Sequence, residues 1–335
     1  MTARQSIIPV FIPHLGCPHD CVFCNQKRIS GSLLPAGPED IVRAVEGGLK
    51  QSAGRPQLAF YGGSFTAIDV PEQERLLGAA QPYLKRGELS SLRLSTRPDA
   101  IDDETLDRLA RYGVSTIELG AQSMVDSVLK KSGRGHTSLD TEKAAKHIKS
   151  RGFQLILQMM TGLPGSSDEL DIETAKRVIS LKPDGVRIYP TVIIRDTALF
   201  DLWQAGKYRE HTVEDAVRVC AEILPLFEKA GIPVIRLGLN PTDDLSGGDA
   251  AGGAYHPALG ELVRSRIMLK KAEALLDRLH AGGTVTFAVA PSCVSQMIGQ
   301  RRCNAEYLME KYSLSAVKVV KGDVPRGEVR LVGAD

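Results

Sequence analysis

The sequence predicts an α/β fold: a partial (β/α)6 barrel followed by a small C-terminal α/β extension. Short apolar runs alternate with amphipathic stretches at regular intervals, a pattern typical of parallel strands joined by helices. The six βα units are too many for a simple dinucleotide-binding fold and two short of an eight-fold barrel. From Thr284 onward the pattern is strand, loop, helix, strand, turn and strand, which predicts the separate extension.

Each βα unit is predicted from an apolar run and the amphipathic segment after it. The predicted strands are Ile7–Ile12, Gln57–Tyr61, Ser91–Ser95, Thr116–Leu119, Gln154–Met160 and Gly185–Tyr189. The predicted helices are Pro38–Gln51, Pro71–Lys85, Asp102–Arg111, Ser123–Lys131, Ser138–Arg151 and Asp168–Leu181. Asp102 and Ser138 are suitable helix caps, and glycines follow two of the helices, at Gly113 and Gly152.

The chain after the sixth unit divides into a loop and a further domain. A helix is predicted at Thr212–Ala230, followed by the apolar run "IPVIRLGL" and the Gly-, Asp- and Pro-rich stretch "NPTDDLSGGDAAGGAYHP", which predicts a loop or lid. Another helix is predicted at Ala258–His280. We therefore expect a barrel over residues 1–240, a Gly-rich loop or lid over 241–256, and a helix with a small α/β subdomain over 257–335.

Composition narrows the class of protein. The 335 residues are 43% hydrophobic and 24% charged, with a net charge of +2, so charge alone does not indicate a polyanionic partner. No apolar run approaches the roughly 20 residues that span a bilayer. The N-terminal segment lacks the length and cleavage site of a signal peptide. We expect a cytoplasmic protein without membrane contact, in a reducing compartment where structural disulfides are rare.

Three of the six cysteines lie in the segment "GCPHDCVFCNQKRISG", directly after the first strand. Cys17, Cys21 and Cys24 form a CxxxCxxC motif. A zinc site would need His14 or His19 as a fourth ligand, and a redox pair at Cys21 and Cys24 would leave Cys17 unexplained. An iron–sulfur cluster held by three thiolates would leave one iron open for a ligand. The spacing favours the cluster, with zinc and a thiol site as alternatives.

The segment "CPHDCVFC" resembles the cluster loop of the radical S-adenosylmethionine (SAM) superfamily, and Phe23 fills the aromatic position before the last cysteine. The resemblance implies that Cys17, Cys21 and Cys24 bind a 4Fe-4S cluster whose fourth iron is chelated by SAM. It also implies a six-unit partial barrel. In such a barrel the loop after the first strand lies at the C-terminal rim, where barrel sites are built.

Further motifs follow the cysteines in the order that this resemblance requires. In "FYGGSF", the glycines are similar to those that receive the methionine amino group, where a Cβ would obstruct close approach. In "LSTRPD", the arginine suits a carboxylate because its planar fork can bind both oxygens. The resemblance assigns cofactor binding to Phe23, Gly62, Gly63, Ser64, Ser95, Arg97, Glu118, Gln122, Arg187 and Arg236, and marks Tyr189 as a candidate catalytic residue.

One branch of the superfamily is especially similar, the radical domain of the elongator complex catalytic subunit. The similarity covers about residues 7 to 245 and is most specific in "GRGHT" and "YPTVIIRDTALFDLWQAGKY". It implies modification of the wobble uridine of tRNA with a carboxymethyl group derived from acetyl-CoA. Nothing after Tyr255 resembles an acetyl-CoA pyrophosphate loop, so a separate acetyltransferase is a candidate partner.

The predicted function is reductive cleavage of SAM to a 5′-deoxyadenosyl radical that abstracts hydrogen from an unidentified substrate, with tRNA as a candidate. The electron would come from a donor such as flavodoxin or ferredoxin. The alternatives are a porphyrinogen-oxidising radical SAM enzyme and a non-catalytic metal- or RNA-binding protein.

The tail carries a weak nucleic-acid signal in "MIGQRRCNAEYL", which is faintly similar to the backbone-clamping loop of a KH module, with Arg302 where that loop has its second glycine. The candidate phosphate contacts are Arg301, Arg302, Lys318, Lys321, Arg326 and Arg330, although a solvated face explains them more simply. Cys293 and Cys303 are candidate auxiliary cluster ligands, but two cysteines alone do not hold a 4Fe-4S cluster, so buried structural thiols are favoured there and at Cys220.

Overall fold

The computed structural model describes residues 6–12, 17, 19–25, 36–239, 248–278 and 283–334. The chain divides into two compact units. The first comprises Met1–Thr212 and Leu226–Tyr255, and the second comprises Val213–Pro225 and His256–Asp335. Within the described ranges, no helix is both long and apolar enough to cross a membrane.

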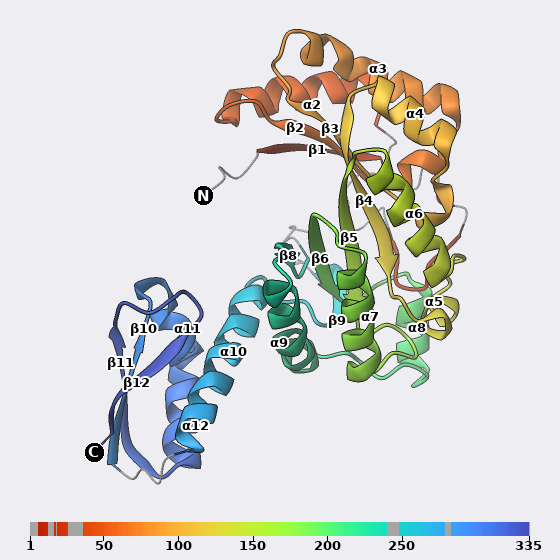
Figure 1. Ribbon diagram of the computed structural model, residues 1–335. Helices are drawn as coiled ribbons and strands as arrows, with labels where there is room; N and C mark the ends of the chain where they lie inside the picture. Colours follow the sequence, from red (N-terminus) through yellow and green to blue (C-terminus); the bar gives the residue numbers. More distant parts are fainter. Residues whose placement is uncertain are drawn as a thin grey trace. The chain divides into compact units, whose positions relative to one another are not determined.

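The first unit is built on a parallel sheet of seven strands in the order β1-β2-β3-β4-β5-β6-β8 (Figure 1). Neighbours in the sheet follow one another in the chain, as in a barrel wall. Apolar runs such as "LAF" in β2 are fully buried, as parallel strands covered on one face by helices require. The strands are β1 (Ile7–Ile12), β2 (Gln57–Gly62), β3 (Ser91–Thr96), β4 (Val114–Gln122), β5 (Gln154–Thr161), β6 (Gly185–Pro190) and β8 (Val234–Leu237).

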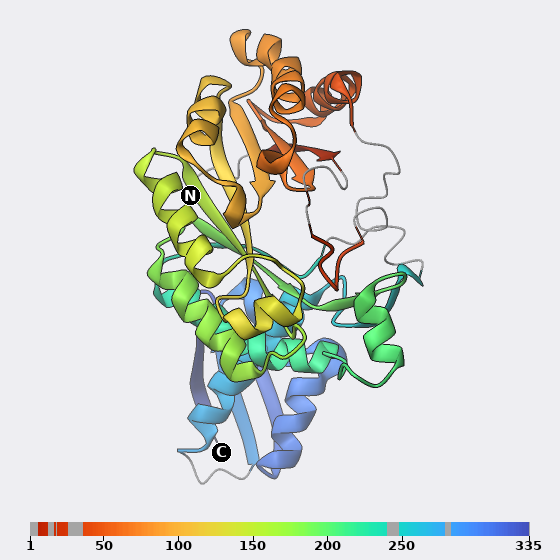
Figure 2. The same cartoon turned by 90° about the vertical axis from the view of Figure 1, so that its right-hand side faces the viewer.

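Helices cover one face of this sheet (Figures 1 and 2). Asp102 caps α4 by accepting from the Thr105 backbone N–H, as predicted, whereas α6 is capped by Thr137 and not by Ser138. Thr137 and Asp140 form a reciprocal capping box there. The helices of this unit are α2 (Pro38–Gln51), α3 (Val70–Lys85), α4 (Asp103–Arg111), α5 (Asp126–Lys131), α6 (Ser138–Ser150), α7 (Asp168–Ser180) and α8 (Ala198–Gln204), and α9 (Val213–Lys229) spans the division between the units.

The structure corrects the element predictions after the sixth unit. The apolar run "IPVIRLGL" contains β8, a seventh strand parallel to β6. Part of the predicted Gly-rich loop is a strand, β9 (Ala250–Gly253), which pairs antiparallel with an unpredicted strand, β7 (Val192–Ile194). Residues 240–247 of that loop lie outside the described ranges. The β9 sequence, "AAGG", has no strand-forming side chain, so its conformation depends on pairing with β7.

The second unit confirms the predicted C-terminal α/β extension. Its sheet has the order β11-β10-β12, with β10 parallel to β11 and antiparallel to β12. Phe287 on β10 is fully buried in a core of its own with Met268, Met297 and Leu308. The elements are α10 (Leu259–Leu276), β10 (Gly283–Val289), α11 (Val294–Ile298), α12 (Cys303–Lys311), β11 (Leu314–Lys321) and β12 (Val329–Ala334).

The remaining cysteines differ in exposure. Cys220 and Cys293 are buried, as predicted, but Cys303 is exposed, because it begins α12 directly after the turn Gly299–Arg302. The prediction of a buried thiol at Cys303 was therefore wrong.

Candidate functional site

A cavity of about 150 Å³ lies at the carboxyl edge of the sheet in the first unit. Because strands β2 to β5 are parallel, their carboxyl ends meet at this edge, and the cysteine segment after β1 closes over it. The lining residues are Cys17, His19, Asp20, Cys21, Phe23, Cys24, Gly62, Gly63, Ser64, Ser95, Thr96, Arg97, Gly120, Gln122, Arg134 and Gln158.

All three cysteines of the CxxxCxxC motif line the cavity. The Cys21 Sγ accepts a hydrogen bond from Arg134 Nη1 at 3.2 Å, and Cys17 Sγ lies 3.5 Å from Ser64 Oγ. Cys24 N–H donates to the Cys21 carbonyl at 2.9 Å, which closes the turn between them. Of the two histidines considered as zinc ligands, His19 lines the cavity and His14 lies outside the described residues. No group of three His, Cys, Asp or Glu in the described residues is arranged to hold a single metal ion.

The cysteine segment is fixed from two sides. Val22 N–H donates to the Ser132 carbonyl at 3.1 Å, and the Val22 carbonyl accepts from Leu199 N–H of α8 at 2.7 Å. Figure 2 shows residues 19–25 of this segment beside α8, away from the helices that cover the sheet. These bonds hold the loop over the strand ends.

The glycine motif at the end of β2 is held close to β1. Gly62 has a φ of +106°, and a Cβ there would lie 3.3 Å from the backbone of Ile12. Gly63 N–H donates to the Ile12 carbonyl at 3.1 Å. The close approach of β2 to β1 therefore favours glycine at position 62, and Gly62, Gly63 and Ser64 all line the cavity.

Arg97 and Gln122, two polar residues that line the cavity, differ in whether their side chains have hydrogen-bond partners. Arg97 is almost fully buried, and its fork binds the Asp99 carboxylate through Nε at 2.9 Å and Nη2 at 3.0 Å. Gln122 ends β4 with a φ of +64°, and its buried Oε1 has no hydrogen-bond partner among the described residues. A buried acceptor of this kind is a candidate contact for a bound group.

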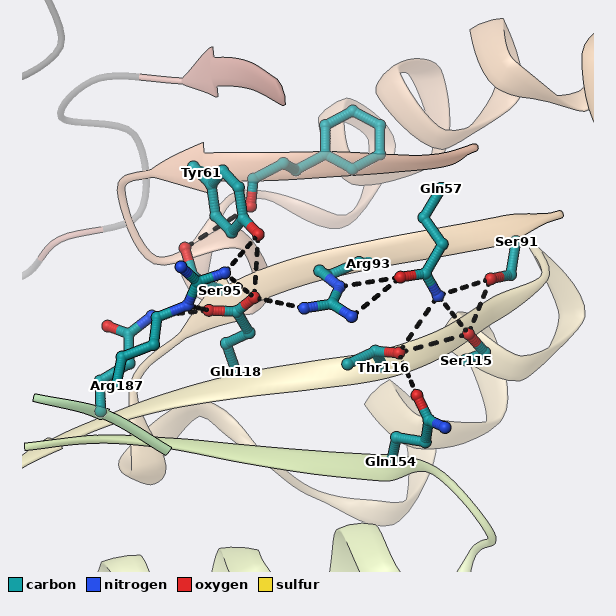
Figure 3. Close-up of polar contacts among 12 residues, drawn as sticks. Gln57, Tyr61, Ser91, Arg93, Ser95, Ser115, Thr116, Glu118, Gln154 and Arg187 are labelled. Carbon is teal, nitrogen blue, oxygen red and sulfur yellow. Dashed lines mark hydrogen bonds and ion pairs between the residues drawn. The ribbon is translucent and has the colours of Figure 1, made fainter. Parts of the chain in front are cut away.

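Glu118, Arg187, Arg236 and Tyr189 do not line the cavity. Glu118 is fully buried on β4, where Oε1 accepts from Arg93 Nη1 at 2.9 Å and Oε2 accepts from Arg187 Nε at 2.8 Å (Figure 3). Tyr61 Oη also donates to Oε1, at 2.9 Å. Burial alone would raise the pKa of Glu118, but the two guanidinium groups outweigh burial and hold this pKa below its ordinary value.

The hydrogen-bond network around Glu118 extends to the cavity through Gln158. This residue lines the cavity and donates to Glu118 Oε2 at 3.0 Å. With one carboxylate between two guanidinium groups, the network carries one net positive charge in the interior of the half-barrel. Burial also raises the pKa of Tyr61 and of Tyr189, so both phenols keep their protons at neutral pH. Arg236 lies half-buried on β8.

Sequence reasoning missed several cavity residues, above all Arg134. The signal that the sequence offers is the fragment "GRGHT", in which glycines lie on either side of the arginine. His136, two residues on, is buried, and its Nε2 donates to the Ala121 carbonyl at 3.3 Å. Burial, aided by the charge of Arg134, lowers the pKa of His136 to about 4.

The fold and this cavity define an α/β protein of barrel type with a candidate site at the carboxyl edge of its sheet. A family model described as the radical SAM superfamily matches residues 11–178, and one for the radical SAM C-terminal domain matches residues 183–268. The chain belongs to the radical SAM superfamily.

Relatives of known sequence and structure point to one branch. The chain is 29% identical over 267 residues to the tRNA uridine(34) acetyltransferase of Methanocaldococcus infernus, covering 67% of this chain and 50% of that protein. It is 35% identical over 136 residues to human Elongator complex protein 3, covering 40% and 25%. The archaeal Methanocaldococcus infernus Elp3 with an N-terminal deletion shares the fold, with a TM-score of 0.62 at 23% identity, over 81% of this chain and 64% of that one. The chain thus spans about half the length of the first of these relatives.

Proposed function

We propose that the cavity binds a 4Fe-4S cluster through Cys17, Cys21 and Cys24 and holds SAM beside it. The observation that carries the proposal is that three thiols from one loop and the ends of four parallel strands meet at a single cavity. When bound, the cluster would supply the electron that cleaves SAM to a 5′-deoxyadenosyl radical.

The residues present fit these groups. Cys21 already accepts a hydrogen bond from a guanidinium group, as a thiolate ligand would. Gly63, Ser64 and Ser95 border the cavity and could orient SAM, and the unpartnered Gln122 Oε1 could accept from it. Phe23 would bring an aromatic face to the same cavity. An electron donor such as flavodoxin or ferredoxin is the partner that this chemistry requires.

The test is anaerobic reconstitution with iron and sulfide, followed by dithionite and SAM. We expect iron and sulfide to bind and 5′-deoxyadenosine to form. Cys21→Ala should lose both the cluster and the product, while Cys303→Ala, which changes an exposed cysteine of the second unit, should keep both. A protein with a full cluster that forms no 5′-deoxyadenosine would overturn the proposal, and zinc in place of iron would favour the metal-binding alternative.

We further propose that the substrate is a uridine of tRNA. Support comes from the relatives, one of which is named for action on tRNA uridine(34), and from the second unit. Residues 256–335 contain twelve Lys and Arg against eight Asp and Glu. The turn Gly299–Arg302 joins α11 to α12 between β10 and β11, and its exposed Arg301 and Arg302 make no ion pair among the described residues. A βααβ unit with a loop between its helices is the arrangement that KH modules use to hold an RNA backbone.

The substrate proposal is tested by RNA binding and by nucleoside analysis. Cellular RNA crosslinked to the protein should contain tRNA, and a deletion strain should lack one modified uridine. The double variant Arg301→Glu and Arg302→Glu should weaken tRNA binding at least tenfold and reduce its dependence on salt. Arg278→Glu, which changes an exposed arginine in the turn after α10, is the matched control. Accumulation of an unoxidised porphyrinogen in the deletion strain would support the porphyrinogen-oxidising alternative.

A further inference from the structure

The turn from Ser132 to His136 packs against the cysteine segment through two glycines. A Cβ on Gly133 would lie 3.1 Å from the Asp20 carbonyl oxygen, and a Cβ on Gly135 would lie 2.2 Å from the imidazole of His19. Both glycines have positive φ, +65° and +74°. The positive φ angles and these close contacts favour glycine at both positions, and the residue between them lies beside Cys21.

That residue, Arg134, is only 7% exposed and is fixed on three sides. Nη1 donates to Cys21 Sγ at 3.2 Å, Nη2 donates to the Gly120 carbonyl at 2.6 Å, and its own carbonyl accepts from Arg97 Nη2 at 2.5 Å. Its Nε has no partner among the described residues. Among the described residues, no carboxylate oxygen lies within ion-pair distance of this guanidinium.

A buried positive charge that donates to a ligand sulfur has a definite effect on a cluster. Reduction adds one negative charge to the cluster, and a nearby cation in a low-dielectric site stabilises the more negative state. A hydrogen bond to a ligand thiolate withdraws electron density from the iron, and this also favours the reduced cluster. Gly133 and Gly135 allow this contact, because they let the turn place the arginine beside Cys21.

We infer that Arg134 is a positioning residue that raises the reduction potential of the cluster bound by Cys17, Cys21 and Cys24, and that Gly133 and Gly135 exist to place it. The inference rests on the proposed cluster site. It assigns Arg134 no direct part in the reaction of the substrate: its effect is on how readily the cluster accepts the electron.

The experiment is a redox titration of the reconstituted protein followed by electron paramagnetic resonance, without SAM. For Arg134→Gln we expect at least a tenfold lower ratio of reduced to oxidised cluster at a given potential, a shift of about 59 mV for a one-electron couple. Arg134→Lys keeps the charge and one donor, and should fall between this variant and the unchanged protein. Arg111→Gln, which removes an exposed arginine of α4, should leave the potential unchanged.

The outcomes separate this inference from the proposed function. If the unsubstituted protein binds no iron–sulfur cluster, both the inference and the proposed function are overturned. If Arg134→Gln binds a cluster with the same reduction potential as the unsubstituted protein, the inference is overturned but the proposed function is not. Loss of the cluster from both Arg134 variants, with secondary structure retained, would assign Arg134 to holding the loop and would also overturn the inference.

Discussion

Glu118 shows how a buried charge is accommodated in the interior of the half-barrel. Its carboxylate is fully buried, and each oxygen accepts from a guanidinium group at 2.8–2.9 Å. Desolvating three charges costs several kcal/mol per ion, and close pairing offsets that cost. Removing the carboxylate alone would leave Arg93 and Arg187 facing each other without a counter-charge.

Glu118→Gln should therefore lower the free energy of unfolding by about 3–5 kcal/mol. Tyr61→Phe removes only the phenol that donates to the same carboxylate, and should cost about 1 kcal/mol. Urea unfolding measures both, because urea leaves ionic strength unchanged. Equal costs for the two variants would show that the charge of Glu118 is not what stabilises the network.

Asp171 gives a pH dependence of known sign. It is buried in the first turns of α7, where it accepts from Gly162 N–H at 2.8 Å and from Ser166 Oγ at 2.5 Å. Burial outweighs these bonds and raises the pKa of Asp171 to about 7, from 3.8. The folded state therefore prefers the protonated acid, so this contribution to stability is full below pH 4 and is lost as the pH rises through 7.

Asp171→Asn removes the titrating group, so the variant does not lose this contribution to stability as the pH rises. Its free energy of unfolding relative to the unchanged protein should rise between pH 5 and pH 8, by on the order of a few kcal/mol. The difference between the two proteins is the quantity to measure, because the lowered pKa of His136 gives both proteins the opposite slope as the pH falls below 6.5. A difference that is flat over this range would contradict the raised pKa.

At the scale of elements, Gly253 fixes the short sheet formed by β7 and β9. It has a φ of +83°, and a Cβ there would lie 2.8 Å from the Thr191 carbonyl oxygen. Its N–H donates to Glu210 Oε1 at 2.7 Å. The approach of β9 to β7 therefore leaves no room for a side chain.

Gly253→Ala should open the β7–β9 pair while the seven-stranded sheet stays intact. Hydrogen exchange of residues 192–194 and 250–253 should become at least tenfold faster, with exchange in β2 to β5 unchanged. Gly47→Ala is the matched control, since a Cβ at Gly47 meets nothing within 4 Å and alanine suits the interior of α2. Unchanged exchange in Gly253→Ala would mean that the pair adjusts to the side chain.

The elements that sequence predicted best are those whose apolar pattern is dictated by burial. The six strands of the successive βα units appear in the sheet because each is an apolar run flanked by helix-starting or turn residues. The seventh strand, β8, was not predicted: it has only four residues, and in the structure three are partly buried and Ile235 is exposed. Side-chain partners were not predictable: Arg93, Glu118 and Arg187 come from three different strands, and spacing along the chain does not show that they meet. The cavity was predicted by motif order, but Arg97 binding Asp99 and Arg134 reaching Cys21 depend on the folded turns.

At the scale of the whole molecule, the two units have separate cores. Phe287 is fully buried in a cluster drawn entirely from α10 to β12, whereas Phe60 is fully buried on β2 of the first sheet. The chain has one tryptophan, Trp203 of α8, which lies in the first unit. Its fluorescence therefore reports the first unit alone, while far-ultraviolet circular dichroism reports both.

Phe287→Ala should remove about 3–5 kcal/mol from the second core, because it deletes a large buried side chain and leaves a cavity. If the cores unfold separately, part of the circular dichroism signal will be lost at lower urea while the Trp203 transition stays in place. Phe60→Ala, the matched change in the first core, should move the Trp203 transition to lower urea. Coincident shifts of both signals in Phe287→Ala would show that the two units unfold as one cooperative structure. In that case a substitution in the second unit would also destabilise the cysteine-lined cavity of the first.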